Sequence, residues 1–169
     1  MGNNMNEICV NLGCGNVKQK GWVGIDVRKF PAVDYVMNIG KEKLPFEDNS
    51  VDKIHADHLF EHFHPEELFF CMEECWRVLK SKGHLLVSVP KAGTLAYYIH
   101  PDHKIPFVEE TFGFFQVPAD GKDRHGYLKG FWHVTMMESS NPHAIAAKLF
   151  PNKPDDRYDY QEVKLLGEY

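Results

Sequence analysis

A short segment with two glycines, Asn11-Leu12-Gly13-Cys14-Gly15-Asn16, follows a run of apolar residues and has the composition of a ligand-binding loop. Because glycine lacks a Cβ, Gly13 and Gly15 let the backbone turn sharply and approach a ligand closely. No Gly-Lys-Ser/Thr sequence follows, which excludes a triphosphate-binding P-loop. Lys18 stands where a dinucleotide fingerprint has its third glycine, so a pyrophosphate site is not expected.

A carboxylate ends the next apolar run, in Gly24-Ile25-Asp26-Val27. At the tip of a strand beside the glycine loop, Asp26 can accept hydrogen bonds from both hydroxyls of a ribose. A lone Gly-x-Gly sequence is more often a plain turn, but here the loop and the carboxylate follow consecutive predicted strands. Together they predict a nucleoside site, either in an enzyme or in a nucleoside-binding protein without catalysis.

The elements that position these residues form an α/β pattern, because short runs rich in β-branched residues alternate with helical or loop stretches. The predicted strands are residues 8–12, 22–27, 34–39, 51–56, 84–89, 131–137 and 161–166, and the predicted helices are 65–80, 106–116 and 142–149. Only residues 16–22 join the glycine loop to the second strand, whereas a parallel crossover needs about 10 to 12 residues. The first helix is therefore reduced, and residues 28–33 likewise leave almost no helix after the second strand. One face of the sheet is then thinly covered, and a second copy of the chain in a homodimer could cover it.

Length and composition point to one globular domain over residues 1–169, with 43% hydrophobic and 25% charged residues. No window approaches the ~18 apolar residues of a membrane span, and the first residues lack the blocks of a signal peptide. We therefore expect a cytoplasmic protein that does not act on membranes. Four cysteines without a CxxC pair favour reduced thiols over zinc ligands, and the net charge of −5 disfavours nucleic acid as a partner.

The order and spacing of several segments make residues 8–90 resemble the class I S-adenosylmethionine-dependent methyltransferases, particularly the small members described as methyltransferase type 11. These segments are residues 11–16, 21–26, 44–52, 58–62 and 77–80, together with the Lys82-Gly83 turn and Ser88-Val89-Pro90. The resemblance implies a three-layer Rossmann-like fold with a seven-stranded, mostly parallel sheet and an antiparallel last strand. It also implies S-adenosylmethionine as the cofactor and methyl transfer as the activity.

The resemblance further implies a cofactor site made of Asn11, Leu12, Gly13, Cys14, Gly15, Asp26, Val27, Asn38, Ile39 and His58. The glycine loop would line the methionine part, and Asp26 would hold the ribose. The family usually has an aspartate for the adenine amino group where this chain has Asn38, whose side-chain oxygen can still accept that hydrogen bond without charge assistance. The main-chain carbonyl of His58 would face the cofactor's ammonium.

Two histidines are candidate catalytic residues. A sulfonium methyl group is already activated, so the protein must chiefly bring a nucleophile in line with it and exclude water. Where the acceptor must lose a proton, His62 and His103 have a suitable intrinsic pKa for a general base.

The same region contains a competing metal motif, because His58-Leu59-Phe60-Glu61-His62 reads as HxxEH. In zinc hydrolases with that motif, two histidines bind the metal and the glutamate activates water. The motif works only on a helix, where its first and last positions share a face, and here Pro65 restarts the backbone shortly after His62. We therefore expect no metal site, and a zinc hydrolase using His58, Glu61 and His62 is the alternative of another class.

Residues 91–132 are rich in aromatic side chains and poor in regular patterns, which indicates a lid or insertion over the acceptor site. The chain lacks the Asp/Asn-Pro-Pro-Tyr segment of amino-methylating DNA enzymes and the Pro-Cys pair of the cytosine type. With the acidic net charge, this favours an O or N atom of a small molecule or sugar as the methyl acceptor. RNA or protein is the alternative acceptor.

Overall fold

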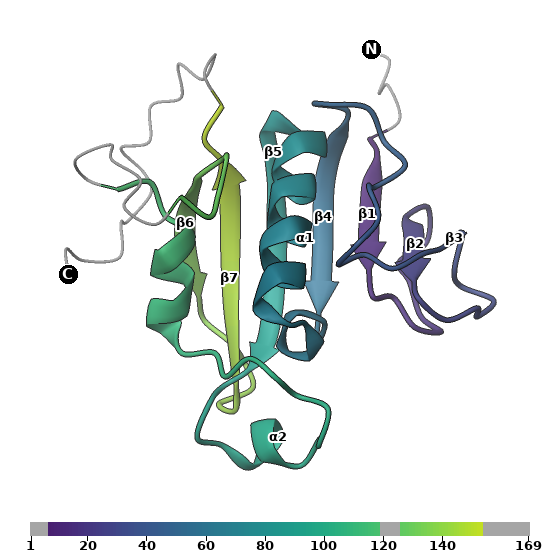
Figure 1. Cartoon of the computed structure of the whole chain (residues 1–169). Coiled ribbons are helices and arrows are strands. Elements are labelled where there is room, and N and C mark those ends of the chain that lie inside the picture. The colour runs from purple at the N-terminus through teal and green to yellow at the C-terminus, as the bar shows by residue number, and fades with distance from the viewer. Residues whose placement is uncertain (1–6, 119–125, 154–169) are drawn as a thin grey trace.

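One mixed sheet organises the chain in this computed structural model, which describes residues 7–118 and 126–153. The sheet has seven strands in the order β3-β2-β1-β4-β5-β7-β6 (Figure 1). Neighbouring strands pair in parallel from β3 to β5, while β7 is antiparallel to both β5 and β6. The predicted Rossmann-like sheet, mostly parallel with an antiparallel last strand, is confirmed.

The strands are β1 (Cys9–Leu12), β2 (Val23–Asp26), β3 (Tyr35–Val36), β4 (Val51–Asp57), β5 (Leu79–Pro90), β6 (Trp132–Met137) and β7 (Ala144–Pro151). The α-helices are α1 (Pro65–Val78) and α2 (Leu95–Tyr98), and the 3-10 helices are η1 (Phe60–His62) and η2 (Glu109–Phe115). The predicted strand at 161–166 lies outside the described residues. Among the helices of the described residues, none has the length and apolar character required to span a bilayer.

The predicted helix at 142–149 is wrong, because this segment forms β7. Its buried residues are Ile145, Ala147, Leu149 and Pro151, which alternate with partly exposed neighbours in the period of a strand. Pairing with β5 on one side and β6 on the other outweighs the helix propensity of its alanines. The polar residues before this segment form the β6–β7 turn, where Asn141 Oδ1 accepts the His143 N–H at 3.0 Å.

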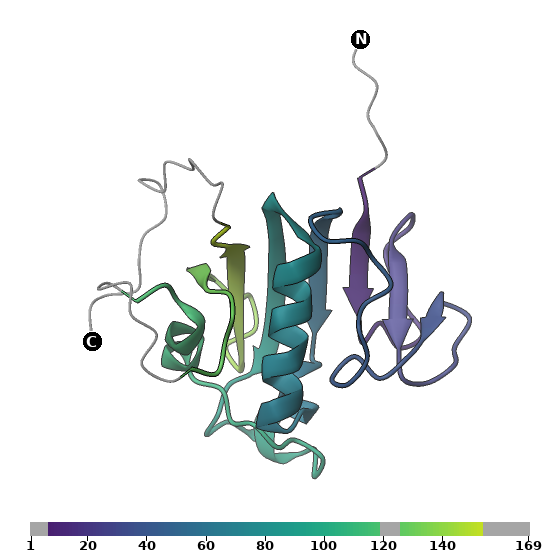
Figure 2. The ribbon, with the colours of Figure 1, turned by 45° about the horizontal axis from the view of Figure 1, so that its top comes forward.

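Helix α1 covers one face of the sheet, as Figure 2 shows. It begins at Pro65, and the Glu67 carboxylate accepts the N–H of His64 at 2.9 Å. Its buried stripe consists of Leu68, Cys71, Met72, Glu74, Cys75 and Val78. The segment predicted as a helix at 106–116 is the 3-10 helix η2, which packs beside α1 through contacts of Phe114 and Phe115 with Phe69.

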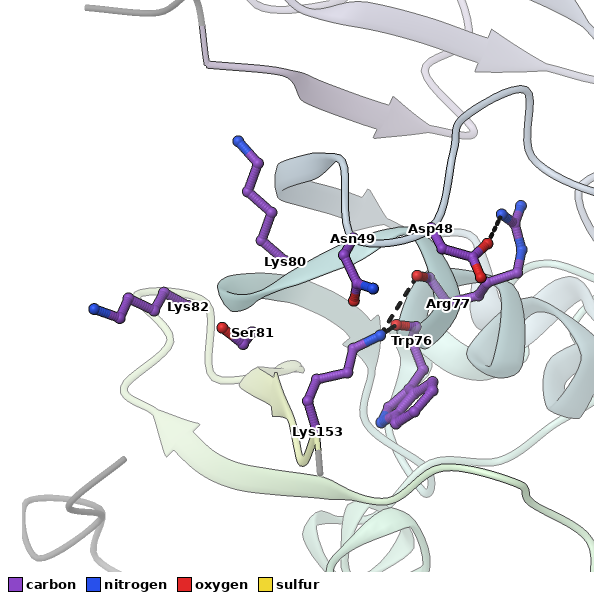
Figure 3. A pocket seen from close by; sticks show the side chains of 8 residues that line it. All are labelled: Asp48, Asn49, Trp76, Arg77, Lys80, Ser81, Lys82 and Lys153. Atoms are coloured by element: carbon purple, nitrogen blue, oxygen red, sulfur yellow. Dashed lines mark hydrogen bonds and ion pairs between the residues drawn. The ribbon is translucent and has the colours of Figure 1, made fainter. Parts of the chain in front are cut away.

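Two basic side chains near the C-terminal end of α1, Arg77 and Lys153, line a pocket. This pocket lies at the edge of the sheet opposite to the carboxyl ends of β1 and β4. Figure 3 shows its lining, in which Arg77 binds Asp48 and Lys153 reaches the main-chain oxygens of Trp76 and Arg77. The Lys153 ammonium also lies 3.7 Å from the centre of the Trp76 ring. Carbonyl groups at a helix C-terminus are stabilised by such cations, so this pocket has a structural explanation.

The face of the sheet that α1 does not cover carries no helix in the part of the chain that the structure describes (Figure 1). Paired positions place Lys53, His84, Leu86, Lys148 and Phe150 on this open face, and all five are partly exposed. The connections after β1 and β2 are loops, which agrees with the predicted reduction of the first helices. Over the described residues, the sheet therefore has two layers where the resemblance implied three.

His84 on the open face predicts a loss of stability in mild acid. Burial, followed by the charges of Lys148 and Lys53, lowers the pKa of His84 from 6.5 to about 4. Between these values the unfolded chain binds a proton that the folded chain does not, so the free energy of unfolding falls as the pH drops through this window. Because the ring is partly solvated, we expect a loss of about 1 to 2 kcal/mol.

The measurement is urea unfolding at pH 7 and pH 4.5 of the wild-type protein and of His84→Gln. The drop in stability should be smaller in the variant by about 1 to 2 kcal/mol. His143→Gln, at an exposed position in the β6–β7 turn, is the matched control and should keep the wild-type drop. Equal drops in all three proteins would contradict the prediction.

Candidate active site

The candidate site lies at the carboxyl ends of the parallel strands, at the lower edge of the sheet in Figure 1. The sheet order reverses between β1 and β4, because β2 lies on one side of β1 and β4 on the other. Such a switch point leaves a crevice between the loops that follow the two central strands, and ligands of open α/β sheets bind there. The loops after β1, β2, β4 and β5 all meet at this edge.

The glycine loop is hydrogen-bonded directly to the C-terminal end of β2. Asp26 is only 5% exposed, and its Oδ2 accepts the Gly15 N–H at 2.9 Å while its Oδ1 accepts the Arg28 N–H at 2.8 Å. The Cys14 N–H donates to the Ile25 carbonyl at 3.1 Å. Since each carboxylate oxygen has two acceptor positions, Asp26 can hold the loop and still accept hydroxyl groups from a ligand. The glycine loop and the Asp26 carboxylate, which were predicted to form one site, therefore lie together.

The two glycines of this loop meet different surroundings. Both have positive φ, +64° at Gly13 and +53° at Gly15. A Cβ added to Gly13 would lie 2.9 Å from Leu59 Cδ1, whereas a Cβ added to Gly15 would have no heavy atom within 4 Å. The loop is therefore packed against the β4 connection at Gly13 and open at Gly15, beside the Asp26 carboxylate. This open space suits the close approach of an adenosyl ligand.

The other predicted cofactor residues contribute unequally. Val27 is 61% exposed next to Asp26 and offers an apolar surface, whereas the Leu12 side chain is fully buried in the core. Asn11 donates its side-chain amide to Gln19 at 3.2 Å. Leu12 can therefore face a ligand only through its main chain, and the Asn11 side chain is engaged with the following loop.

The turn after β3 holds the predicted adenine residues. Asn38 Oδ1 accepts the Gly40 N–H at 3.2 Å, and the Asn38 N–H donates to Glu42 Oε1 at 2.6 Å. Ile39 is buried, so its side chain belongs to the core. The Asn38 oxygen keeps a second acceptor position, which is compatible with a hydrogen bond from an adenine amino group.

A buried glutamate lies in η1, shortly after the end of β4. Glu61 in η1 is fully buried, and its Oε1 lies 3.1 Å from Nδ1 of His58, which has a φ of +51°. This hydrogen bond raises the pKa of His58. His58 therefore precedes η1 and contacts Glu61 directly, so the HxxEH residues do not share one helix and the hydrolase arrangement is not formed.

Segment 97–105 returns to this glutamate after β5. The main-chain oxygen of Glu61 accepts the N–H groups of Lys104 at 2.7 Å and Ile105 at 3.1 Å. Further along the predicted lid, Phe107, Phe112 and Phe115 are buried in the core. Among the described residues of 91–132, the first part lies at the site edge, and residues 119–125 fall outside the described residues.

The two candidate catalytic histidines lie next to each other, although 40 residues separate them in sequence. Their ring centres are 4.8 Å apart at a steep angle. His62 Nδ1 lies 2.9 Å from Asp102 Oδ2, and His103 Nδ1 lies 2.8 Å from the Tyr97 carbonyl. The His103 side chain is only 4% exposed and its Nε2 lies 3.9 Å from Glu61 Oε1. Asp102 is a site residue that was not predicted; its one signal in the sequence is its place in the His100-Pro101-Asp102-His103 run.

Comparisons with known proteins agree with this geometry. Residues 18–87 match the family model of a methyltransferase domain, and no curated protein matches the chain. A SAM-dependent methyltransferase from Archaeoglobus fulgidus superposes with a TM-score of 0.60 at 19% identity, covering 85% of this chain and 86% of that one. Burkholderia thailandensis 1,6-didemethyltoxoflavin-N1-methyltransferase gives 0.57 at 13% identity, covering 86% and 71%. Haemonchus contortus phosphoethanolamine N-methyltransferase 1 gives 0.58 at 12% identity, covering 93% and 42%.

The fold and the glycine loop at its switch point define a Rossmann-like α/β domain with a place for an adenosyl ligand. The family match over residues 18–87 and the similarity in fold to S-adenosylmethionine-dependent methyltransferases support the class I methyltransferase that the motifs predicted. S-adenosylmethionine is the cofactor of this class.

Proposed function

We propose that the protein transfers a methyl group from S-adenosylmethionine to an O or N atom of a small molecule or sugar. The observation that carries the proposal is the hydrogen bond from the Gly15 N–H to Asp26 at 2.9 Å, beside open space at Gly15. A glycine main chain and a carboxylate held together in this way offer donors and acceptors within reach of one adenosyl group. The loop lacks the residues that bind a triphosphate or a pyrophosphate.

The residues of the chain have separate tasks in this proposal. Asp26 accepts the ribose hydroxyls, Asn38 accepts from the adenine amino group, and the main chain of Gly13 to Gly15 lies along the methionine part. The His58 carbonyl faces the ammonium. When bound, the cofactor supplies a methyl group on a positively charged sulfur, so the protein's remaining work is to align the acceptor and exclude water.

We place the acceptor between the glycine loop and segment 97–105, which serves as part of the lid. His62 and His103 lie on this side and are the candidates for accepting a proton. An acceptor atom with a free lone pair needs no base, so the proposed activity does not require proton uptake by either ring.

A small acceptor is supported by the net charge of −5, which does not attract polyanions. It is also supported by the similarity to enzymes that methylate 1,6-didemethyltoxoflavin and phosphoethanolamine, both named as N-methyltransferases. RNA and protein remain the alternative acceptors within the class. The predicted homodimer would have to form over the open face of the sheet, and it stays a prediction together with the cytoplasmic location.

Calorimetry with S-adenosylhomocysteine, the demethylated product, tests the proposal. We expect one molecule to bind per chain with a dissociation constant on the order of micromolar. ATP, which carries adenosine with a triphosphate, is the control and should not bind, because the loop has no P-loop lysine. Absence of S-adenosylhomocysteine binding by the folded protein, or equal binding of ATP, would contradict the proposed site. A screen of acceptors with methyl-labelled cofactor then identifies the substrate.

A further inference from the structure

The residues Glu61, His62 and His103 form a cluster of potential metal ligands beside the cofactor site. One ligand atom from each lies within 4.8 Å of the others. Two imidazoles and one carboxylate form a ligand set typical of zinc and of other divalent transition metals. We propose that this cluster, called here the Glu61 cluster, binds one divalent transition metal ion. The proposal does not depend on the cofactor assignment.

The Glu61 carboxylate gives the first argument for a bound ion. Its side chain is fully buried, and its Oε2 atom has no hydrogen-bond partner among the described residues. An uncompensated carboxylate oxygen in a buried position is costly, and buried charges are usually paired or coordinate a metal. His58 satisfies only Oε1, at 3.1 Å. A cation bound by the Glu61 carboxylate would compensate the charge of this buried side chain.

The orientation of the two histidines gives a second, independent argument. Each has one ring nitrogen held by an acceptor: His62 Nδ1 by Asp102 Oδ2 at 2.9 Å, and His103 Nδ1 by the Tyr97 carbonyl at 2.8 Å. Metal-binding histidines show the same arrangement, in which a carboxylate or carbonyl fixes the ring and leaves the other nitrogen for the ion. His103 Nε2 accordingly lies on the side of Glu61, 3.9 Å from Oε1.

The spacing of the ligands is compatible with a metal ion after a small adjustment. Zinc binds nitrogen and oxygen ligands at about 2.0 to 2.2 Å, so two tetrahedral ligands lie roughly 3.4 Å apart. The ligand atoms of the cluster lie within 4.8 Å of one another, so shifts of about 1 Å close the site. Since the protein supplies three ligands, a fourth position stays open toward water or an acceptor.

This site differs from the HxxEH motif that the sequence suggested. His58 is hydrogen-bonded to Glu61 and is not a ligand in the proposed site. The second histidine ligand is His103, which lies in the segment after β5. Asp102 and the Tyr97 carbonyl position the two histidines and do not bind the ion. No hydrolytic activity follows from this arrangement.

Titration of metal-free, untagged protein with Co²⁺ and Zn²⁺ tests the proposal. We expect one Co²⁺ per chain with visible absorption bands of a nitrogen-containing, low-coordinate site, and displacement of Co²⁺ by Zn²⁺. Glu61→Gln and His103→Ala should each weaken Zn²⁺ binding in calorimetry by roughly 100-fold or more, and Asp102→Asn by about 10-fold as a positioning residue. Zn²⁺ should raise the melting temperature of the wild-type protein but not of Glu61→Gln.

The controls separate the cluster from other histidines. His143→Ala, at an exposed position far along the chain, should bind Zn²⁺ as the wild-type protein does. His100, Asp102 and His103 form a second possible ligand group near the surface. Loss of binding in His100→Ala with retention in Glu61→Gln would place the ion there and overturn the proposal. A folded wild-type protein that takes up no Co²⁺ or Zn²⁺ would overturn it as well, and each outcome is independent of S-adenosylhomocysteine binding.

Discussion

Replacing Gly13 by valine should reduce the affinity for S-adenosylhomocysteine by at least about 100-fold. The new Cβ would lie 2.9 Å from Leu59 Cδ1, and the backbone there has a φ of +64°, a conformation that a β-branched residue strongly resists. The loop must then move away from Leu59 or change its backbone conformation. Either change displaces the Gly15 N–H that joins the loop to Asp26, so the cofactor site loses its shape.

Gly93→Val is the matched control for this variant. Gly93 also has a positive φ, +81°, but an added Cβ meets no atom within 4 Å. Both variants therefore carry a similar backbone strain of about 1 to 2 kcal/mol, and only Gly13→Val crowds the loop. Calorimetry should find cofactor binding retained in Gly93→Val and lost in Gly13→Val, with both proteins folded by circular dichroism. Wild-type affinity in Gly13→Val would refute the loop assignment.

Asp26→Ala should weaken binding of S-adenosylhomocysteine by about 2 to 4 kcal/mol, or roughly 30-fold to 1000-fold. The substitution removes the acceptor for the ribose hydroxyls and also releases the Gly15 N–H from its 2.9 Å hydrogen bond. Asp26→Asn keeps one acceptor oxygen and should lie between alanine and the wild-type protein. The measurement is calorimetry, together with the melting temperature of each variant.

The second effect, loosening of the loop, needs its own control. Asp34 accepts the Gly24 N–H of β2 at 2.7 Å and pairs with Lys18, but it is not among the proposed cofactor residues. Asp34→Ala therefore loosens the same part of the chain without removing a ribose acceptor, and should keep cofactor affinity within about threefold. If Asp34→Ala and Asp26→Ala weaken binding equally, Asp26 acts only by holding the loop.

The central sheet and the glycine loop could be predicted from sequence because their signals are local. Short β-branched runs mark β1, β2 and β4, and the loop and Asp26 stand directly after two of them. The short connections at 16–22 and 28–33 also predicted the thinly covered face, since a crossover helix needs more residues than they contain. The alanine-rich segment at 144–151 was wrongly predicted as a helix because its strand conformation depends on pairing with β5 and β6, which no local propensity encodes.

The Glu61 cluster could not be predicted for a related reason. Its members come from η1 and from an irregular segment after β5, joined by the hydrogen bonds from Lys104 and Ile105 to the Glu61 carbonyl. Irregular segments have no hydrophobic period that would fix their path from sequence alone. His62 and His103 could therefore be predicted only as separate candidates, and the structure shows that their rings are in contact.

The position of β7 in the sheet has a consequence for folding during synthesis. Because β7 lies between β5 and β6, the edge of β5 that pairs with β7 stays unpaired until residues 144–151 have left the ribosome, and β6 cannot join the sheet before then. Unpaired strand edges can template aggregation, so nascent chains that stall before residue 144 should be especially dependent on chaperones.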